Sequence, residues 1–417
     1  MTKSIIVTAL LVAFGAAVTA EDWPQWGGPN RDHVSKEKGL LQSWPEGGPR
    51  QRWLSREGGL GYAGFSVAQD RIYTMGAREG IEYLIALGAN DGKEAWAAEI
   101  GRVLKNRWGD GPRGTPTVAG GRVYALGGQG TLVAVDQKTG KLIWKKTMEE
   151  LGGETPNWGY TESVLVENGV VYCTPGGDKG AIAALDSANG NVKWQSKDFT
   201  EAAQYASITP ADLNGTRQLV QLTMKKFAGI DSHNGNLLWE VDFSGRTAVI
   251  PSPVVKGNNV YVTAGYGVGC AMVKISRQNK AEEVYRNKVM VNHHGGVVLV
   301  GEHVYGYSDG KGWTCQDFAT GEEVWADKAL GKGGVTYADG RLYCVEESKG
   351  TVVLAEASAA GWKEQGRFVL EPQTEQRSPS GKIWTHPVVA NGKLYLRDQE
   401  LIFCFDISAT RSVASSQ

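Results

Sequence analysis

The sequence predicts an all-β fold: an eight-bladed β-propeller of four-stranded antiparallel blades, closed by an N-terminal strand. Three observations predict it. A turn followed by a tryptophan recurs at a fixed spacing, and a strand carrying a tyrosine recurs roughly every 40 to 50 residues, the period of propeller blades. The 56 glycines and 14 tryptophans among 417 residues indicate many tight turns between strands that pack through aromatic side chains.

The first 20 residues are predicted to be a cleaved secretory signal peptide. Lys3 gives a positive start, an apolar run covers residues 5–18, and small residues end in Ala20 before the expected cut. The run is too short to span a bilayer comfortably, and no second apolar stretch follows, so we expect no membrane span. The chain is therefore expected in the periplasm or outside the cell, as one propeller domain over residues 21–410 with a disordered tail at 411–417.

Charge excludes two classes of partner. Lys and Arg total 44 and Asp and Glu total 45, which gives a formal net charge of −1 with no long charged run. Such a chain lacks the electropositive surface that nucleic acids or anionic membranes require. We expect a monomer.

The clearest repeat joins a small residue to a tryptophan ten positions later. In the best copy, from Ala134 to Trp144, an aspartate and a Thr-Gly turn lie between them. We predict a hairpin in which the small residue lies on an inner strand, the aspartate accepts hydrogen bonds from the turn, and the glycine takes a positive φ. The tryptophan lies on the next strand and packs against a neighbouring blade. The five copies are Ala86–Trp96, Ala134–Trp144, Ala184–Trp194, Gly229–Trp239 and Cys315–Trp325.

A second series marks an earlier strand of each blade, as a turn, an apolar residue and a tyrosine. Its members are Tyr73, Tyr124, Tyr172, Tyr261, Tyr305, Tyr343 and Tyr395, with Gln218-Leu219-Val220 as a degenerate copy. The count is therefore eight. Seven blades remain the alternative, because one tryptophan hairpin ends in Tyr285 and another passes Trp362 out of register.

The two chain ends complement each other. The last hairpin reaches Cys404, but the tenth residue after it is Ala414 rather than tryptophan, whereas Trp53 has no hairpin before it. We expect the strand around Trp53 to complete the last blade, which removes two open sheet edges.

The Ala-x-Asp-x-x-Thr-Gly-Lys-x-x-Trp run resembles the repeat of pyrroloquinoline quinone (PQQ) propellers. That superfamily includes quinoprotein alcohol dehydrogenases and the lipoprotein propeller of bacterial outer-membrane protein assembly. The stretch from Asp22 to Asp32 looks like the opening of secreted PQQ-like repeat proteins from bacteria such as planctomycetes. The resemblance implies the fold, but the repeat marks blade packing and carries no chemistry.

The resemblance leaves two functions to weigh. If this chain were an alcohol-oxidising member, the resemblance would imply a disulfide between adjacent cysteines, a tryptophan stacked under the cofactor, and calcium held beside an aspartate base. No two of the five cysteines are adjacent here; Trp108, Trp158 and Trp384 could stack a cofactor, but no carboxylate matches by motif. A binding scaffold without a cofactor or catalytic residue is therefore favoured, and a dehydrogenase using PQQ with calcium is the alternative.

Candidate binding residues come from the loops that enter successive blades. Such loops gather on one face of a propeller around its channel, where rings and imidazoles can bind an envelope protein or a polar small molecule. The alternative is that the aromatic residues only wedge between innermost strands. The candidates are Trp108, Arg113, Trp158, Tyr160, Tyr205, His293, His294, Trp384 and His386.

The sequence indicates neither a metal site nor a reactive thiol. His293 and His294 are successive, so in an extended segment they point to opposite sides, and no further ligand follows at metal-binding spacing. Asp212-Leu213-Asn214-Gly215 reads as a turn, because it lacks the remainder of a calcium loop. The cysteines occupy small packed positions of the repeat, where we expect them to act as small hydrophobic residues rather than as a disulfide framework.

Overall fold

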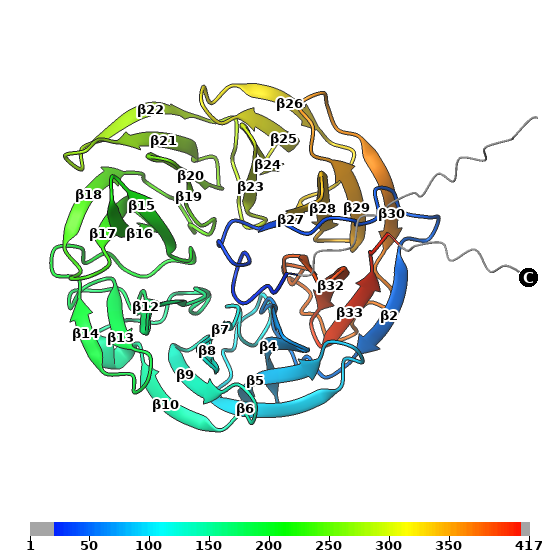
Figure 1. Ribbon diagram of the computed structural model, residues 1–417, viewed down its shortest axis with the longest axis horizontal. Coiled ribbons are helices and arrows are strands. Elements are labelled where there is room, and N and C mark those ends of the chain that lie inside the picture. The colour runs from blue at the N-terminus through cyan, green and yellow to red at the C-terminus, as the bar shows by residue number, and fades with distance from the viewer. Residues whose placement is uncertain (1–20, 410–417) are drawn as a thin grey trace, which may run out of the picture.

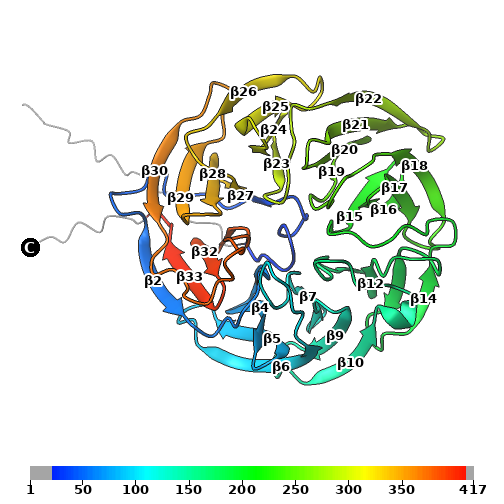
Figure 2. The same ribbon diagram turned by 180° about the vertical axis from the view of Figure 1, so that it is seen from behind.

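Eight antiparallel sheets surround a central axis as blades (Figures 1 and 2). The computed structural model describes residues 21–409, so the predicted signal peptide at 1–20 and the tail at 411–417 lie outside the described residues. Within 21–409, the regular elements are strands, apart from one turn of 3-10 helix, η1 (Glu149–Leu151). The prediction of an all-β propeller with eight blades is confirmed, and the seven-blade alternative is wrong.

The blades are numbered here in chain order, and in each the first strand lies nearest the axis. Blades one and two consist of β3 (Ser66–Ala68), β4 (Arg71–Arg78), β5 (Ile81–Gly88) and β6 (Glu94–Arg102), then β7 (Thr117–Ala119), β8 (Arg122–Leu126), β9 (Thr131–Asp136) and β10 (Leu142–Thr147). Blades three and four consist of β11 (Leu165–Glu167), β12 (Val170–Cys173), β13 (Ala183–Asp186) and β14 (Val192–Gln195), then β15 (Thr209–Leu213), β16 (Thr216–Leu222), β17 (Lys226–Asp231) and β18 (Leu237–Asp242).

The second half of the ring follows the same plan. Blades five and six consist of β19 (Val254–Lys256), β20 (Asn259–Ala264), β21 (Gly269–Ile275) and β22 (Ala281–Asn287), then β23 (Val297–Val300), β24 (His303–Ser308), β25 (Gly312–Asp317) and β26 (Glu323–Asp327). Blade seven consists of β27 (Gly333–Ala338), β28 (Arg341–Glu346), β29 (Thr351–Glu356) and β30 (Glu364–Val369), and blade eight of β31 (Val388–Ala390), β32 (Lys393–Asp398), β33 (Leu401–Asp406) and β2 (Arg50–Ser55).

The predicted hairpin is the outer half of blades one to six. Ala134 on β9 lies opposite Trp144 on β10, next to a register shift that realigns the outer strand. In the turn, Asp136 Oδ1 accepts from the backbone N–H of Lys138 at 3.1 Å and of Thr139 at 2.9 Å. The same pairing recurs at Ala86–Trp96, Ala184–Trp194, Gly229–Trp239, Met272–Tyr285 and Cys315–Trp325.

Five of these six turns also pack one blade against the next through a glycine. Gly190, in blade three, has φ +74°, and a Cβ added to it would lie 2.8 Å from the ring of Trp144 in blade two. That ring's Nε1 donates to the carbonyl of Ser187 in the same turn at 3.0 Å. The interlock repeats at Gly92 with Trp53, Gly140 with Trp96, Gly235 with Trp194, and Gly321 with Tyr285. The tryptophan series therefore packs blades together, as predicted.

Gly235→Ala is expected to destabilise the fold by about 1 kcal/mol more than Gly215→Ala does. Both glycines have a positive φ, +78° and +83°, so both substitutions strain the backbone similarly. Only at Gly235 would the new Cβ meet a ring, at 2.5 Å from Trp194, whereas nothing lies within 4 Å at Gly215. Urea denaturation of the two variants measures the difference, and equal losses would contradict the interlock.

The ring closes between the two ends of the chain. β2 pairs antiparallel with β33, and Trp53 lies opposite Cys404, which confirms the predicted closing strand. Arg397 on β32 secures the same junction from inside, with an exposed fraction of 1%. Its guanidinium donates to the carbonyl of Met75 on β4 of blade one at 2.8 Å. It also donates to the carbonyls of Gly58, Gly59 and Ala63 in the loop before blade one, at 3.1, 2.9 and 3.0 Å.

One blade departs from the predicted four strands. Blade seven has a fifth strand, β1 (Val34–Ser35), which pairs parallel with the innermost strand β27. The segment before it crosses the centre of the ring, where Figure 1 shows it in dark blue. Trp23 exchanges backbone hydrogen bonds with Val67 of β3, and Pro24 O accepts from Val118 N of β7 at 2.7 Å. Residues 21–35, the N-terminal segment, thus link blades one and two to blade seven.

The five cysteines are buried and form no disulfide. Cys315 and Cys404 lie on third strands opposite the tryptophans, and Cys173 and Cys344 follow tyrosines on second strands. Burial raises the pKa of Cys173, Cys315, Cys344 and Cys404. These thiols pack as small apolar groups, as the repeat positions predict.

Candidate functional site

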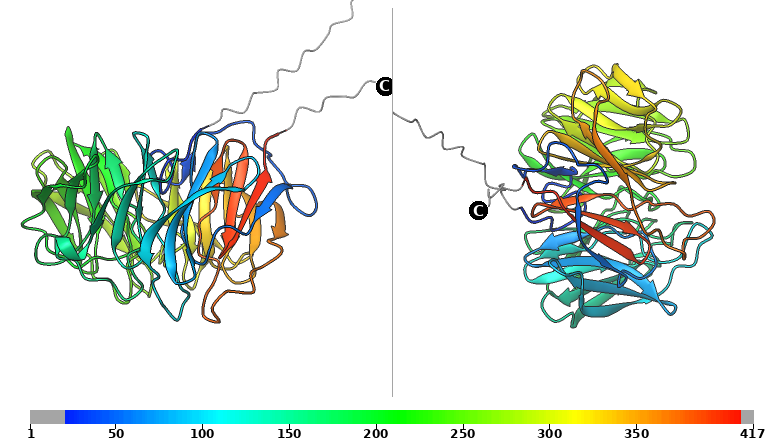
Figure 3. Two further views of the ribbon diagram at one scale, coloured as in Figure 1. Left: turned by 90° about the horizontal axis from the view of Figure 1, so that it is seen from below. Right: turned by 90° about the vertical axis from the view of Figure 1, so that its right-hand side faces the viewer.

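A cavity of about 420 Å³ lies on the axis, between the N-terminal segment and the loops that enter the blades. Seen from the side in Figure 3, the N-terminal segment lies toward one end of the ring. Of the nine residues predicted from sequence, eight line this cavity: Trp108, Arg113, Trp158, Tyr205, His293, His294, Trp384 and His386. Residues from blade-entry loops far apart in sequence are therefore brought together here.

Tyr160 lies elsewhere. Its exposed fraction is 1%, and it packs in the core between blades two and three. Its hydroxyl donates to the carbonyl of Pro175 at 2.9 Å. For this residue the alternative interpretation, an aromatic wedge between strands, describes its place.

The N-terminal segment supplies cavity residues that sequence reasoning did not select, namely Trp26, Asn30, Arg31, Asp32 and His33. Arg31 anchors this segment, because its guanidinium donates to Ser163 O at 2.6 Å and to Val164 O at 3.3 Å. Burial lowers the pKa of Arg31 to about 10. Glu162, buried nearby, accepts from the hydroxyl of Thr174 at 2.9 Å, and burial raises its pKa to about 7.

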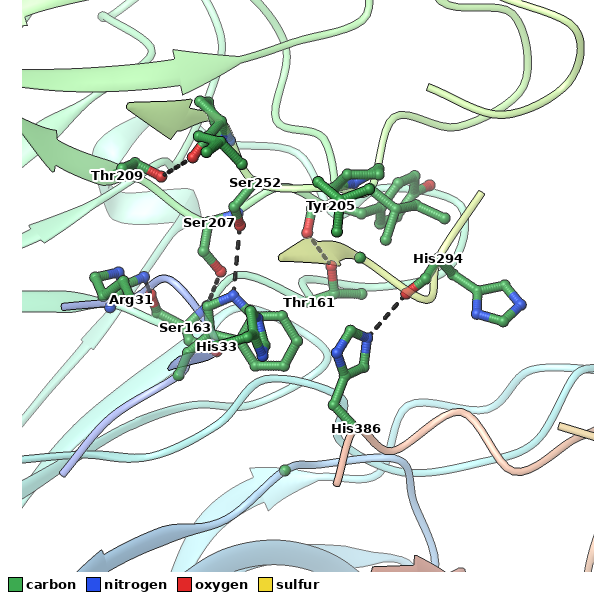
Figure 4. A pocket seen from close by; sticks show the side chains of 18 of the residues that line it. Arg31, His33, Thr161, Ser163, Tyr205, Ser207, Thr209, Ser252, His294 and His386 are labelled. Atoms are coloured by element: carbon green, nitrogen blue, oxygen red, sulfur yellow. Dashed lines mark hydrogen bonds between the residues drawn. The ribbon is translucent and has the colours of Figure 1, made fainter. Parts of the chain in front are cut away.

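Hydroxyl side chains join the innermost segments of successive blades, as Figure 4 shows in part. Ser163 Oγ accepts from Thr115 N at 2.8 Å, Ser207 Oγ from Ser163 N at 3.0 Å, and Ser252 Oγ from Ser207 N at 3.2 Å. Trp26 Nε1 donates to the same Ser252 Oγ at 3.4 Å. A serine or threonine two residues before the innermost strands of blades two to five is the sequence signal that could have located this wall.

His33 of the N-terminal segment packs against His386 of the loop before blade eight. The rings of His33 and His386 lie 5.0 Å apart, and Trp26 lies 4.5 and 4.8 Å from them. His386 Nε2 donates to His294 O at 2.9 Å, so Nδ1 is the unprotonated nitrogen of a neutral ring. Burial lowers the pKa of His386 to about 4 and that of His33 well below its ordinary value. Both rings are neutral at physiological pH.

The successive histidines take different partners. His294 Nε2 lies 2.6 Å from Glu347 Oε2, which also accepts from Trp384 Nε1 at 3.1 Å. His293 Nδ1 accepts from Lys332 Nζ at 2.8 Å. Burial lowers the pKa of His293 to about 2. Each imidazole is therefore oriented by its own neighbour.

Arg113 lies among the rings at the cavity wall. Its guanidinium donates to Gly111 O at 2.7 Å and Gly109 O at 2.9 Å, and it lies 5.3 Å from the ring centroid of Tyr62. Tyr62 in turn donates its hydroxyl hydrogen to Trp108 O at 2.5 Å. Burial lowers the pKa of Arg113. The loop 105–113 is thereby folded around a cation.

The residues at the cavity do not fit a quinone cofactor held with calcium. Among the described residues, no group of three or more His, Cys, Asp or Glu side chains has the arrangement of a metal site. Asp32 is the one carboxylate in the cavity lining of the described chain; its Oδ1 accepts from Val34 N at 3.1 Å, and burial raises its pKa. Calcium requires several oxygen ligands, with carboxylates prominent among them, and this donor set does not supply them.

Comparison with known proteins points to one family. A family model described as outer membrane protein assembly factor BamB matches residues 80–327. Among curated relatives, outer membrane protein assembly factor BamB of Moranella endobia is 28% identical over 160 residues, which cover 38% of this chain and only 37% of that protein. The same factor of Yersinia pestis is 23% identical over 303 residues, covering 68% of this chain and 71% of its own length.

Solved structures show the same fold. BamB from Moraxella catarrhalis superposes with a TM-score of 0.58 at 16% identity, covering 81% of this chain and 94% of its own. Quinohemoprotein alcohol dehydrogenase from Comamonas testosteroni superposes with a TM-score of 0.64 at 12% identity, covering 95% and 82%. At these identities the likeness concerns the propeller architecture alone. Among residues 21–409, no helix is long and apolar enough to cross a membrane.

Proposed function

This chain belongs to the outer membrane protein assembly factor BamB family of PQQ-like repeat propellers, and from that membership we propose that it is an exported scaffold. In this proposal its blade-entry loops around the channel bind a protein of the cell envelope. The names of the relatives, which describe outer membrane protein assembly, support such a partner. The predicted signal peptide would place the chain in the periplasm or outside the cell.

The observation that carries the proposal is the mutual support of the loops. Asn106 Nδ2 donates to Asn157 O at 3.1 Å, which joins the loops before blades two and three. Ser378 Oγ donates to Arg107 O at 2.6 Å, which joins the loop before blade two to the one before blade eight. A surface held in this way loses little conformational freedom on binding, so more of the contact energy appears as affinity.

The side chains at this face are those that contribute most to protein interfaces. Trp108, Trp158 and Trp384 are partly exposed there, and Tyr266 has an exposed fraction of 37%. Tryptophan, tyrosine and arginine are enriched among residues whose removal costs an interface most. The dehydrogenase alternative lacks comparable support, since the cavity does not offer the ligands of its metal.

Replacing Trp108 and Trp158 together with alanine is expected to weaken partner binding at least about tenfold. The experiment places a photoreactive cross-linker at Arg107, which is exposed beside Trp108, and collects adducts from the envelope fraction. A discrete adduct that disappears in the double variant supports the proposal. The matched control carries the cross-linker at Leu142, 49% exposed on the outermost strand β10. Adducts that are the same at both positions, or that survive the double substitution, would contradict it.

A further inference from the structure

Glu37 is a buried carboxylate that pairs with no cationic side chain of the described chain. Its exposed fraction is 0%, and it lies just after β1, beyond the end of the N-terminal segment. Among residues 21–409, no lysine, arginine or histidine nitrogen lies within 4.0 Å of its oxygens; Lys38, the next cation along the chain, pairs with Asp339 at 3.4 Å. Burial raises the pKa of Glu37, and the negative charge of Glu21 adds to this rise. A buried charge of this kind is costly unless a cation approaches it.

The same carboxylate joins the beginning of the described chain to blade eight. Its oxygens accept from Asn391 N and, at 2.9 Å, from Gly392 N, in the turn between β31 and β32. Glu37 Oε1 also accepts from Glu21 N at 3.1 Å. In return, Glu21 Oε2 accepts from Lys36 N at 2.9 Å. The first residue of the N-terminal segment is thus fastened to the two residues that follow its last.

Glu21 is also the residue that the predicted cut after Ala20 would place first in the mature chain. Before the cut, its nitrogen is an amide with one hydrogen and no charge. Hydrolysis of the bond between Ala20 and Glu21 consumes one water: the carbonyl of Ala20 becomes a carboxylate, and the nitrogen of Glu21 becomes an amine. An α-amino group has an ordinary pKa of about 7.7–8.0, so it binds a proton and is mainly a cation at neutral pH. The cut therefore creates a positive charge at an atom 3.1 Å from the Glu37 carboxylate.

We propose that removal of the signal peptide creates an ion pair between the α-ammonium of Glu21 and the buried carboxylate of Glu37. A charge-assisted hydrogen bond is roughly twice as strong as the neutral bond that it replaces. Because the two ends of the N-terminal segment meet at this pair, it stabilises the segment between them, which carries Arg31 and His33 to the cavity. Processing thereby completes the lining of the cavity. The ion pair depends on the predicted cut and not on the proposed scaffold function.

The first test measures the chemistry of the α-amino group in the exported protein. Mass spectrometry is expected to show Glu21 as its first residue. Near neutral pH, cyanate is expected to modify this amine at least about tenfold more slowly than in E37Q, because pairing raises the pKa of the amine by at least about one unit. The exposed Glu46 provides the matched control, and E46Q is expected to react like wild type. A different first residue, or equal rates in wild type and E37Q, would overturn the proposal.

The second test adds back one residue. A chain that begins at Ala20 has an amide at Glu21 and carries its ammonium about 3.8 Å further along the chain. Both chains are released from a fusion whose protease leaves the chosen first residue, and urea denaturation compares them. We expect the chain that begins at Glu21 to have an unfolding equilibrium constant at least about fivefold smaller. This comparison needs no side-chain substitution, so it stands even if E37Q disturbs folding.

The variants assign the difference to one carboxylate. The stability difference between the two chains is expected to vanish in E37Q and to persist in E46Q. Equal stability of the two wild-type chains, or an undiminished difference in E37Q, would contradict the ion pair. Failure of the cross-linking at Arg107 would leave these results unaffected, so the two proposals fail separately.

Discussion

Replacing Arg397 with methionine is expected to lower the free energy of unfolding by about 3–5 kcal/mol, because it leaves buried acceptors without a donor. The guanidinium also donates to the hydroxyl of Thr74 at 2.8 Å and to Gln399 O at 2.7 Å, besides the four carbonyls at the junction with blade one. Methionine fills a similar volume but donates nothing. The blade junction would then have to separate or admit water.

Urea denaturation of purified Arg397→Met measures this loss. Arg367→Met is the matched control, since Arg367 lies on the outermost strand β30 with its side chain 50% exposed and pairs only with Glu364. Such surface pairs contribute about 0–1 kcal/mol. Similar losses in the two variants would mean that Arg397 does not secure the ring.

Lowering the pH from 7 to 5 is expected to cost the wild-type protein about 2 kcal/mol more stability than it costs His386→Gln. Burial lowers the pKa of His386 from 6.5 to about 4. Between pH 7 and pH 5 the imidazole therefore binds a proton in the unfolded chain but stays neutral in the folded protein, which favours unfolding. The stability that neutral His386 contributes is complete above pH 6.5 and is lost as the pH falls toward 4. Glutamine keeps an N–H that can reach His294 O but does not titrate.

Other groups titrate in the same interval and cancel in this comparison. Burial raises the pKa of Glu162 to about 7, so acidification stabilises the folded state at that site in both proteins. His293 acts in the same sense as His386 and is likewise present in both. Urea denaturation at several pH values gives the two profiles, with the exposed His233→Gln as control. Parallel profiles for wild type and His386→Gln would show that His386 is not buried as described.

The blades were predictable because their determinants are local. A hairpin with Asp136 in its turn and Trp144 on its outer strand forms from one short stretch, and the stretch repeats. Even the closing strand could be predicted from the repeat, because no hairpin precedes Trp53 and no tryptophan stands ten residues after Cys404; the two residues lie opposite each other. Periodicity alone could not reveal the role of Arg397, because all its acceptors except Gln399 O lie more than 300 residues away in the chain.

The part of the site that the blade-entry loops form was predictable, and the part that the N-terminal segment forms was not. The loops before each blade recur with the same period, so their aromatic residues could be assigned to one face, although Tyr160 lies in the core. The stretch containing Trp26 and His33 occurs once, outside the repeat. It reaches the cavity through pairing with β3, β7 and β27, which becomes apparent only when the ring is closed.

The pairing of β2 with β33 also determines when the ring can close during synthesis of the chain. Residues 50–55 leave the ribosome long before their partners at 401–406. Blades one to six each draw their strands from one continuous stretch, so they can assemble as they emerge, while the eighth joins β2 to β31, β32 and β33 and has to wait for them. Loop closure grows costlier by only about 0.6 kcal/mol per doubling of length, so the distance delays closure without forbidding it. The ring of a nascent chain of this design therefore stays open until residues 401–406 have been made.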